Sequence, residues 1–121
     1  MIFKTKFSVQ YHKNKKPHYD LRILSKDKKA LWSWAIPKAR FPENKHEKLL
    51  AIQTEDHPPK YIDFQGRLAD GSKVNVVYIG KCIVNTNNPP VIKIQFLDPP
   101  SITIVLLRIN PETGSYLMML R

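Results

Sequence analysis

Three side chains suited to metal and phosphate chemistry stand at alternate positions of one short run, at His18, Asp20 and Arg22. Residues two apart project from the same face of a β-strand, so the imidazole, the carboxylate and the guanidinium should lie side by side. The first two are ligands for a divalent cation, and the guanidinium can hold a phosphate oxygen. The spacing therefore predicts a metal and phosphate site on one face of a strand.

A second imidazole precedes this run at His12, across the loop KNKKP, whose Pro17 directs the chain into an extended conformation. Two neutral imidazoles and one carboxylate offer mixed ligands to Mn²⁺, Zn²⁺, Co²⁺ or Fe²⁺ and leave open positions for water or substrate. Strand geometry alone does not place His12, and ligand type does not choose the metal. The alternative is a surface ion pair between Asp20 and Arg22 beside two solvated histidines.

A second polar cluster, EDHPPKY, follows the strand-like run LLAIQT and contains His57 and Tyr61. Loops at strand ends commonly carry functional residues. His57 can donate a proton to a leaving oxygen or neutralise a phosphate oxygen, and Tyr61 can supply a further hydrogen bond. The alternative is an acidic turn with Tyr61 packed at the edge of the sheet.

The charge balance favours a polyanionic partner. Twenty lysines and arginines face ten acidic residues, a formal charge of +10. A small domain this basic attracts nucleic acid before any specific contact forms, although a solvated basic surface is the simpler alternative. The candidates for contacts with backbone phosphates are Lys13, Lys15, Lys16 and Lys38.

Eight short runs of alternating apolar and polar residues supply the elements that must position these side chains. Period two predicts half-buried strands, and turn-prone segments such as NTNNPP and NPETG separate them. We expect an all-β fold, a closed antiparallel barrel of about eight strands, with one or two short helices. The helix is expected over residues 42–50, PENKHEKLL, and the two tryptophans of LWSWAI should point into the core. The runs are IFKTKFSVQ, HYDLRIL, ALWSWAI, LLAIQTE, KVNVVYIGKCIV, PVIKIQF, SITIVLLRI and SYLMMLR.

Length and composition indicate one domain over residues 1–121, since two units of half this size would each bury too little apolar surface. No apolar run approaches the roughly 20 residues of a membrane-spanning helix, and no secretory leader is evident. The lone Cys82 excludes an internal disulfide. We therefore expect a cytoplasmic, intracellular protein without membrane contact, with a monomer favoured.

With these residues in view, the chain resembles the 3′-phosphoesterase domain family found at the N-terminus of bacterial DNA ligase D and as stand-alone archaeal and bacterial proteins. Three motifs carry the resemblance in order, at compatible separations. They are FSVQYHKNKKPHYDLRI, LWSWAIPK and TEDHPPKYIDFQG. The chain departs from the family after FQG, where it reads RLADGSKVNVV in place of a Pro-Glu-Gly segment and a glycine-rich turn.

The resemblance implies a β-barrel with a Mn²⁺-dependent activity on DNA or RNA/DNA 3′ ends, with Zn²⁺ or Co²⁺ as alternative metals. Such an enzyme removes a 3′-terminal ribonucleoside and then the 3′ phosphate in DNA repair, and leaves a hydroxyl for a separate polymerase or ligase. By position, His12, His18 and Asp20 correspond to metal ligands. Arg22 and His57 correspond to contacts with the scissile phosphate, and Tyr61 to a further active-site residue.

Two other functions use the same residues. A non-catalytic barrel that binds single-stranded nucleic acid needs only the basic surface. An iron oxygenase also uses two histidines and one carboxylate, and the His18-Tyr19-Asp20 spacing suits it. That enzyme would need its third ligand downstream, at His46 or His57.

Overall fold

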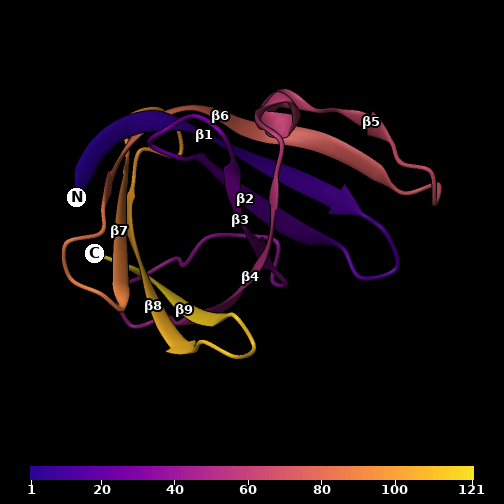
Figure 1. Ribbon diagram of the computed structural model, residues 1–121. Coiled ribbons are helices and arrows are strands. Elements are labelled where there is room, and N and C mark those ends of the chain that lie inside the picture. The colour runs from indigo at the N-terminus through magenta and orange to yellow at the C-terminus, as the bar shows by residue number, and fades with distance from the viewer.

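All eight alternating runs form strands in the computed structural model, which describes residues 1–121 (Figure 1). A ninth strand of two residues and a single 3₁₀ turn, η1, were not anticipated. No helical segment is long and apolar enough to cross a membrane. The elements are β1 (Ile2–Lys13), β2 (His18–Leu24), β3 (Leu31–Ile36), β4 (Leu49–His57), η1 (Pro59–Asp63), β5 (Gly66–Arg67), β6 (Lys73–Asn85), β7 (Val91–Phe96), β8 (Thr103–Asn110) and β9 (Ser115–Leu120).

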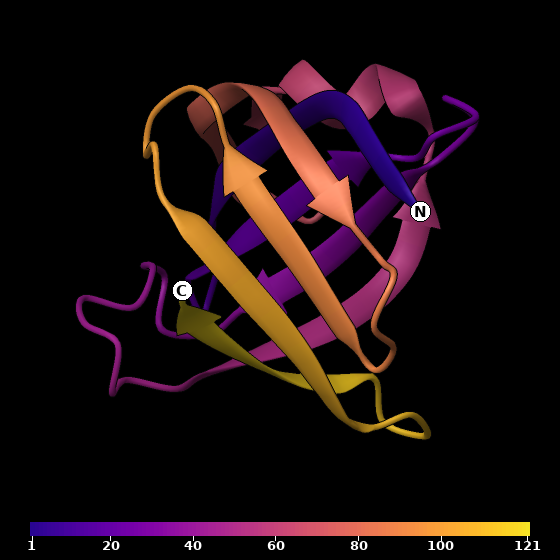
Figure 2. The same ribbon diagram turned by 90° about the vertical axis from the view of Figure 1, so that its left-hand side faces the viewer.

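The sheet closes on itself. Its strand order is β1-β2-β3-β4-β9-β8-β7-β6, and β6 pairs again with β1, so eight antiparallel strands form a complete ring. Figure 2 shows β7 and β8 crossing in front of the strands of the first half of the chain. Strand β5 pairs only with β6 and lies outside the ring. The prediction of a closed barrel of about eight strands is confirmed.

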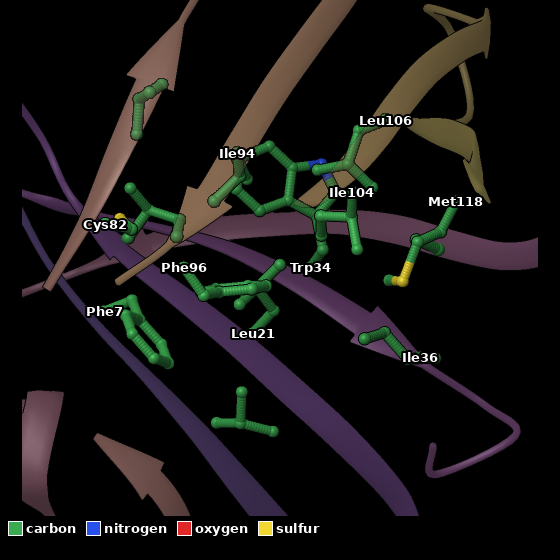
Figure 3. Close-up of a cluster of buried hydrophobic side chains, with 14 of the residues drawn as sticks. Phe7, Leu21, Trp34, Ile36, Cys82, Ile94, Phe96, Ile104, Leu106 and Met118 are labelled. Atoms are coloured by element: carbon green, nitrogen blue, oxygen red, sulfur yellow. The ribbon is translucent and has the colours of Figure 1, made fainter. Parts of the chain in front are cut away.

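Alternate apolar side chains of the eight strands fill the interior of this ring. Phe7, Leu21, Trp34 and Ile94 are each at most 1% exposed and pack in one cluster with side chains from all eight strands (Figure 3). Trp32 is partly buried against the same cluster. Both tryptophans therefore point inward, as expected. Burial of this apolar surface is the main force that favours the folded barrel.

The alternation of β6 breaks at one point. Val9 of β1 pairs with Tyr78, whereas the next residue, Gln10, pairs with Val76, so Val77 is an extra residue in β6. This β-bulge lets Tyr78 face the interior beside Val9 while Val76 faces outward beside Gln10. The bulge therefore aligns the first half of β6 with the polar outer face of β1.

The helix expected over residues 42–50 is wrong. Residues 43–46 form bends and a turn, and β4 begins at Leu49. The side chain of Asn44 accepts hydrogen bonds from the backbone N–H groups of His46 and Glu47, which favours a turn over a helix. Glu47 forms an ion pair at 2.6 Å with Arg40, which precedes this segment. A nine-residue segment is in any case short for a stable helix.

Gly80 leaves room for Asp98 in the barrel wall. A Cβ atom at position 80 would lie 2.5 Å from the Cβ of Asp98. The Asp98 carboxylate accepts a hydrogen bond from the backbone N–H of Lys81 at 2.7 Å and is thereby held in place. A side chain at position 80 would therefore displace this contact.

We predict that Gly80→Ala lowers the free energy of unfolding by about 1–3 kcal/mol, because the added methyl group overpacks this contact. Urea unfolding of the purified protein measures the change. The neighbouring Ile79 is 51% exposed, so Ile79→Ala should stay within about 0.5 kcal/mol of wild type. Equal stability of both variants would contradict the prediction.

Candidate metal and phosphate site

The predicted chemistry-bearing residues lie on β1, β2, the end of β4 and η1, and Figure 1 shows β4 leading into η1. On β1 and β2 they alternate with core residues, so their side chains point to the outer face of the barrel. Cross-strand pairing places His12 opposite His18 and Gln10 opposite Asp20. Arg22 lies opposite Ser33 of β3. These side chains help to line a pocket of about 480 Å³. Its lining residues are Gln10, His12, His18, Asp20, Arg22, Thr54, His57, Tyr61, Phe64, Leu68 and Val74.

Two imidazoles and a carboxylate converge at one side of the pocket. One ligand atom from each of His12, His18 and Asp20 lies within 4.8 Å of the other two. His18 Nε2 is 3.3 Å and His12 Nδ1 is 3.8 Å from the Asp20 carboxylate. Asp20 is buried and both histidines are partly exposed. A cation held by these three groups would have its pocket side open.

A hydrogen-bonded chain outside the cluster sets the tautomer of His12. The hydroxyl of Ser72 donates to Asp70 at 2.6 Å, so its oxygen must accept the 2.8 Å hydrogen bond from His12 Nε2. The proton of neutral His12 therefore resides on Nε2. The lone pair of Nδ1 faces Asp20, which is the arrangement that a metal ligand needs.

A main-chain group does the same for His18. The carbonyl oxygen of Lys16 can only accept, so His18 Nδ1 donates to it at 2.9 Å. The lone pair of Nε2 then faces Asp20. When the ring is protonated, Nε2–H donates to Asp20, and this hydrogen bond raises the pKa of His18; burial opposes the rise, and the Lys16 carbonyl adds to it. A carboxylate that stabilises a proton on Nε2 also stabilises a divalent cation at that position.

The guanidinium of Arg22 forms the next wall of the pocket, and its side chain is 11% exposed. Its Nε donates to the Gln10 side chain at 2.8 Å, and Nη1 donates to the Ser33 hydroxyl at 2.7 Å. Nη2 makes no hydrogen bond within the protein and lies 3.9 Å from the Asp20 carboxylate. Burial lowers the pKa of Arg22, and Asp20 opposes the change. The guanidinium stays charged at neutral pH and keeps donors free for an anion.

His57, at the end of β4, is oriented by the same guanidinium. Arg22 Nη1 is 2.9 Å from His57 Nδ1 and can only donate, so Nδ1 accepts and the ring proton resides on Nε2. Burial is the larger cause that lowers the pKa of His57, and the positive charge of Arg22 lowers it further. His57 is therefore a neutral hydrogen-bond donor in the pocket.

Tyr61 reaches the pocket from η1. The backbone oxygen of Tyr61 accepts a hydrogen bond from Gln10 Nε2 at 2.7 Å, which ties η1 to the sheet. Its ring packs edge-on against Phe64, with the centroids 5.7 Å apart. All six residues predicted for the active site, the three metal ligands, the two phosphate contacts and Tyr61, thus line one pocket.

The predicted nucleic-acid contacts divide into two groups. Lys13, Lys15 and Lys16 line a neighbouring cleft on the β1–β2 side of the site. Lys38 is exposed in the turn that follows β3 and lines neither the pocket nor this cleft.

Several supporting residues escaped the sequence analysis. Gln10 and His12 are two apart in one strand, so period two would have placed Gln10 on the ligand face. Ser33, between the two tryptophans, faces outward by the same rule. No local signal reveals Asp70 and Ser72, because the contact of Ser72 with His12 depends on how the β5–β6 loop folds back.

The chain is similar to one known family. A family model described as the DNA Ligase D 3′-phosphoesterase domain matches residues 10–86. The multifunctional non-homologous end joining protein LigD of Mycobacterium bovis is 46% identical over 65 residues, which is 54% of this chain and 8% of the relative. Proteins of the same name from Mycolicibacterium smegmatis and Pseudomonas aeruginosa are 46% and 39% identical over 66 residues, with the same coverage. The chain thus spans a small fraction of the length of these relatives.

We predict that Ser72→Ala weakens Mn²⁺ binding about 10- to 100-fold, because His12 loses the acceptor that sets its tautomer and ring orientation. Isothermal titration calorimetry measures the affinity. Ser115→Ala is the matched control, since that hydroxyl bonds only with Thr113 in the β8–β9 turn. Unchanged affinity in Ser72→Ala would show that this hydroxyl does not orient the ligand.

We predict that His57 titrates below 6.5, its ordinary value, in an NMR pH titration of the metal-free protein. Arg22→Gln should raise the pKa of His57, because a neighbouring positive charge is lost. Asp20→Asn should lower it, because that carboxylate favours the protonated ring. As the pH falls, His57 is protonated in the unfolded chain near pH 6.5, before it is protonated in the folded protein. The free energy of unfolding that comes from keeping this ring neutral is therefore present above pH 6.5 and is lost as the pH falls toward the lower pKa of the folded state. Shifts of the same sign in both variants would refute this account.

Proposed function

Because the family model matches more than half of the chain, the protein belongs to the DNA ligase D 3′-phosphoesterase domain family, and we propose that it hydrolyses phosphoesters at nucleic-acid 3′ ends. One observation carries the proposal. The three-ligand cluster and the pair formed by Arg22 and His57 line the same small pocket. A phosphate in this pocket would meet positive charge and hydrogen-bond donors from two sides.

The proposed metal ligands are His12 Nδ1, His18 Nε2 and a carboxylate oxygen of Asp20. The donor set fits a divalent cation, because both imidazole lone pairs are directed at the carboxylate by partners on their far sides. Mn²⁺ is the proposed metal, and Zn²⁺ and Co²⁺ accept the same ligands. When bound, the cation supplies Lewis-acid stabilisation of charge on a phosphoryl oxygen.

The proposed roles of the protein groups follow from their protonation. Arg22 Nη2 neutralises a second phosphoryl oxygen, and the Nε2–H of His57 donates a hydrogen bond to the same group. The lowered pKa of His57 supports a hydrogen-bonding role over proton transfer, because a neutral imidazole is a poor acid. Tyr61 is proposed to contribute a further hydrogen bond from η1.

The proposed reaction is hydrolysis in two stages. A water oxygen bonds to phosphorus, the ester bond to the leaving oxygen breaks, and the leaving oxygen gains a proton. The first stage releases a 3′-terminal ribonucleoside, and the second releases inorganic phosphate and leaves a 3′ hydroxyl. A separate ligase or polymerase is the proposed user of that hydroxyl in DNA repair, in keeping with the end-joining name of the relatives.

Neither alternative function is favoured by the geometry. The oxygenase would need a ligand downstream of Asp20, yet His57 Nδ1 accepts a hydrogen bond from Arg22 and His46 is exposed outside the cluster. A non-catalytic nucleic-acid binder would not need two imidazole lone pairs directed at one buried carboxylate. The assay described next distinguishes such a nucleic-acid binder from a hydrolase.

We predict that the protein converts a DNA strand ending in one 3′ ribonucleotide to a 3′-phosphate product and then to a 3′ hydroxyl, with Mn²⁺ and not with chelator. Denaturing gels of a 5′-labelled strand resolve the products. His18→Ala should abolish processing, and Arg22→Gln should slow it about 10²- to 10³-fold, because each removes charge stabilisation at the phosphate. His46→Ala, outside the pocket, is the matched control.

Binding of the strand without any processing would support the non-catalytic alternative. Processing by His18→Ala at the wild-type rate would place the catalytic centre elsewhere.

A further inference from the structure

A basic cleft lies beside the proposed catalytic pocket, at the ends of strands β1, β5 and β6. Its two walls are the loop between β1 and β2 and the loop between β5 and β6, which extend from the same side of the barrel (Figure 1). The cleft has a volume of about 910 Å³, and none of its nine lining residues is hydrophobic. Its cationic residues, here called the cleft cations, are Lys13, Lys15, Lys16, Arg67 and Lys73.

Three of the cleft cations are direct neighbours across the strands. Lys73 of β6 pairs with Lys13 of β1 on one side and with Arg67 of β5 on the other. Like charges directly opposite one another destabilise a sheet. A row of three exposed cations therefore has no structural benefit of its own, and it creates a strong attraction for a polyanion.

One carboxylate lies in the cleft and does not neutralise these cations. Asp70 accepts hydrogen bonds from the backbone N–H of Ser72 at 2.9 Å and from its hydroxyl at 2.6 Å. The Ser72 hydroxyl in particular lowers the pKa of Asp70, so this carboxylate is ionised and held by its own loop. None of the cleft cations forms an ion pair within 4.0 Å. Arg67 Nη1 donates a hydrogen bond to the Gly71 carbonyl oxygen at 3.3 Å, and the charges of all five cations remain without an ion-pair partner.

The cleft adjoins the proposed metal site, because one residue of each cleft wall is hydrogen-bonded to a proposed metal ligand. Ser72, at the end of the β5–β6 loop, is hydrogen-bonded to His12. The carbonyl of Lys16, in the β1–β2 loop, is hydrogen-bonded to His18. A chain of phosphates that leaves the metal site toward these loops therefore passes directly among the cleft cations.

We propose that the cleft binds the sugar–phosphate backbone of the strand whose 3′ end occupies the catalytic pocket. The inference rests on the proposed function and extends it to the substrate upstream of the scissile phosphate. The pocket of about 480 Å³ has the size of a small-ligand site, so the rest of the strand must lie outside it. Without aromatic side chains the cleft offers no stacking surface for bases, so recognition is by phosphate and independent of sequence.

The first test measures binding without catalysis. A fluorescent single strand that ends in a 3′ hydroxyl is titrated in chelator, and the affinity is followed as salt is raised. Five phosphate contacts predict a slope of log K against log salt of about −3.5, and Arg67→Ala/Lys73→Ala should reduce it to about −2.1. The double variant should bind roughly 25-fold more weakly at 0.1 M salt.

The matched control is Lys26→Ala/Lys29→Ala, which removes two exposed cations from the turn between β2 and β3, at the other end of these strands. It should change the affinity and the slope much less than the cleft variant. The cleft variant should melt close to the wild-type temperature, because relief of repulsion along the cation row offsets the loss of the Arg67–Gly71 hydrogen bond. Equal losses of affinity in both double variants would overturn the proposal, because binding would then depend on the net charge of the protein and not on the cleft.

The second test separates this proposal from the proposed function. The kcat/KM values for a 3′-phosphorylated dodecanucleotide and a 3′-phosphorylated dinucleotide are compared in wild type and in Arg67→Ala/Lys73→Ala. The ratio of long to short substrate should fall roughly 25-fold in the cleft variant, through KM. An unchanged ratio would overturn the assignment of the cleft to the 3′-ended strand. Hydrolysis of neither substrate by wild type would instead refute the proposed function and leave the binding result to stand.

Discussion

The whole site depends on a guanidinium that has been taken out of water. A buried cation needs hydrogen-bond acceptors and a counter-charge, and the Nε and Nη1 groups of Arg22 find acceptors on three other strands, Gln10 of β1, Ser33 of β3 and His57 of β4. Gln10 then holds η1 through the backbone of Tyr61. The tautomer of His57, the position of η1 and the shape of the pocket all follow from satisfying this one charge.

Strand alternation separates stability from chemistry in this barrel. One set of alternate side chains packs in the interior, and the other set, on β1 and β2, carries His12, His18, Asp20 and Arg22 on the outer face. Outer faces are usually solvated. Here β4, η1 and the β5–β6 region cover the face, so Gln10 is 1% exposed although it lies outside the barrel. A partly dry environment strengthens the electrostatic interactions on which phosphate binding depends.

Much of this arrangement could be predicted from the sequence, because the alternation of apolar and polar residues indicates both where the strands lie and which face each side chain occupies. All eight runs form strands, and His18, Asp20 and Arg22 lie on one face as their spacing required. The predictions failed or were silent where contacts are distant or local interactions compete. The turn around Asn44 replaces the expected helix, and the contact of Ser72 with His12 joins residues 60 apart in the chain. Such a contact leaves no periodic trace in the sequence.

The two histidines proposed as metal ligands are oriented by different groups, and this affects how the site would tolerate mutation. His18 is held by the main-chain carbonyl of Lys16, which every residue at that position supplies, so the contact survives a change of side chain. His12 is held by a hydroxyl that few amino acids provide. Within the proposed metal cluster, the orientation of His18 should therefore tolerate more substitutions of its partner than the orientation of His12. A homologue that lacks a hydroxyl at position 72 would need another hydrogen-bond acceptor for His12. The main-chain acceptor of His18 is present whatever the side chain at position 16.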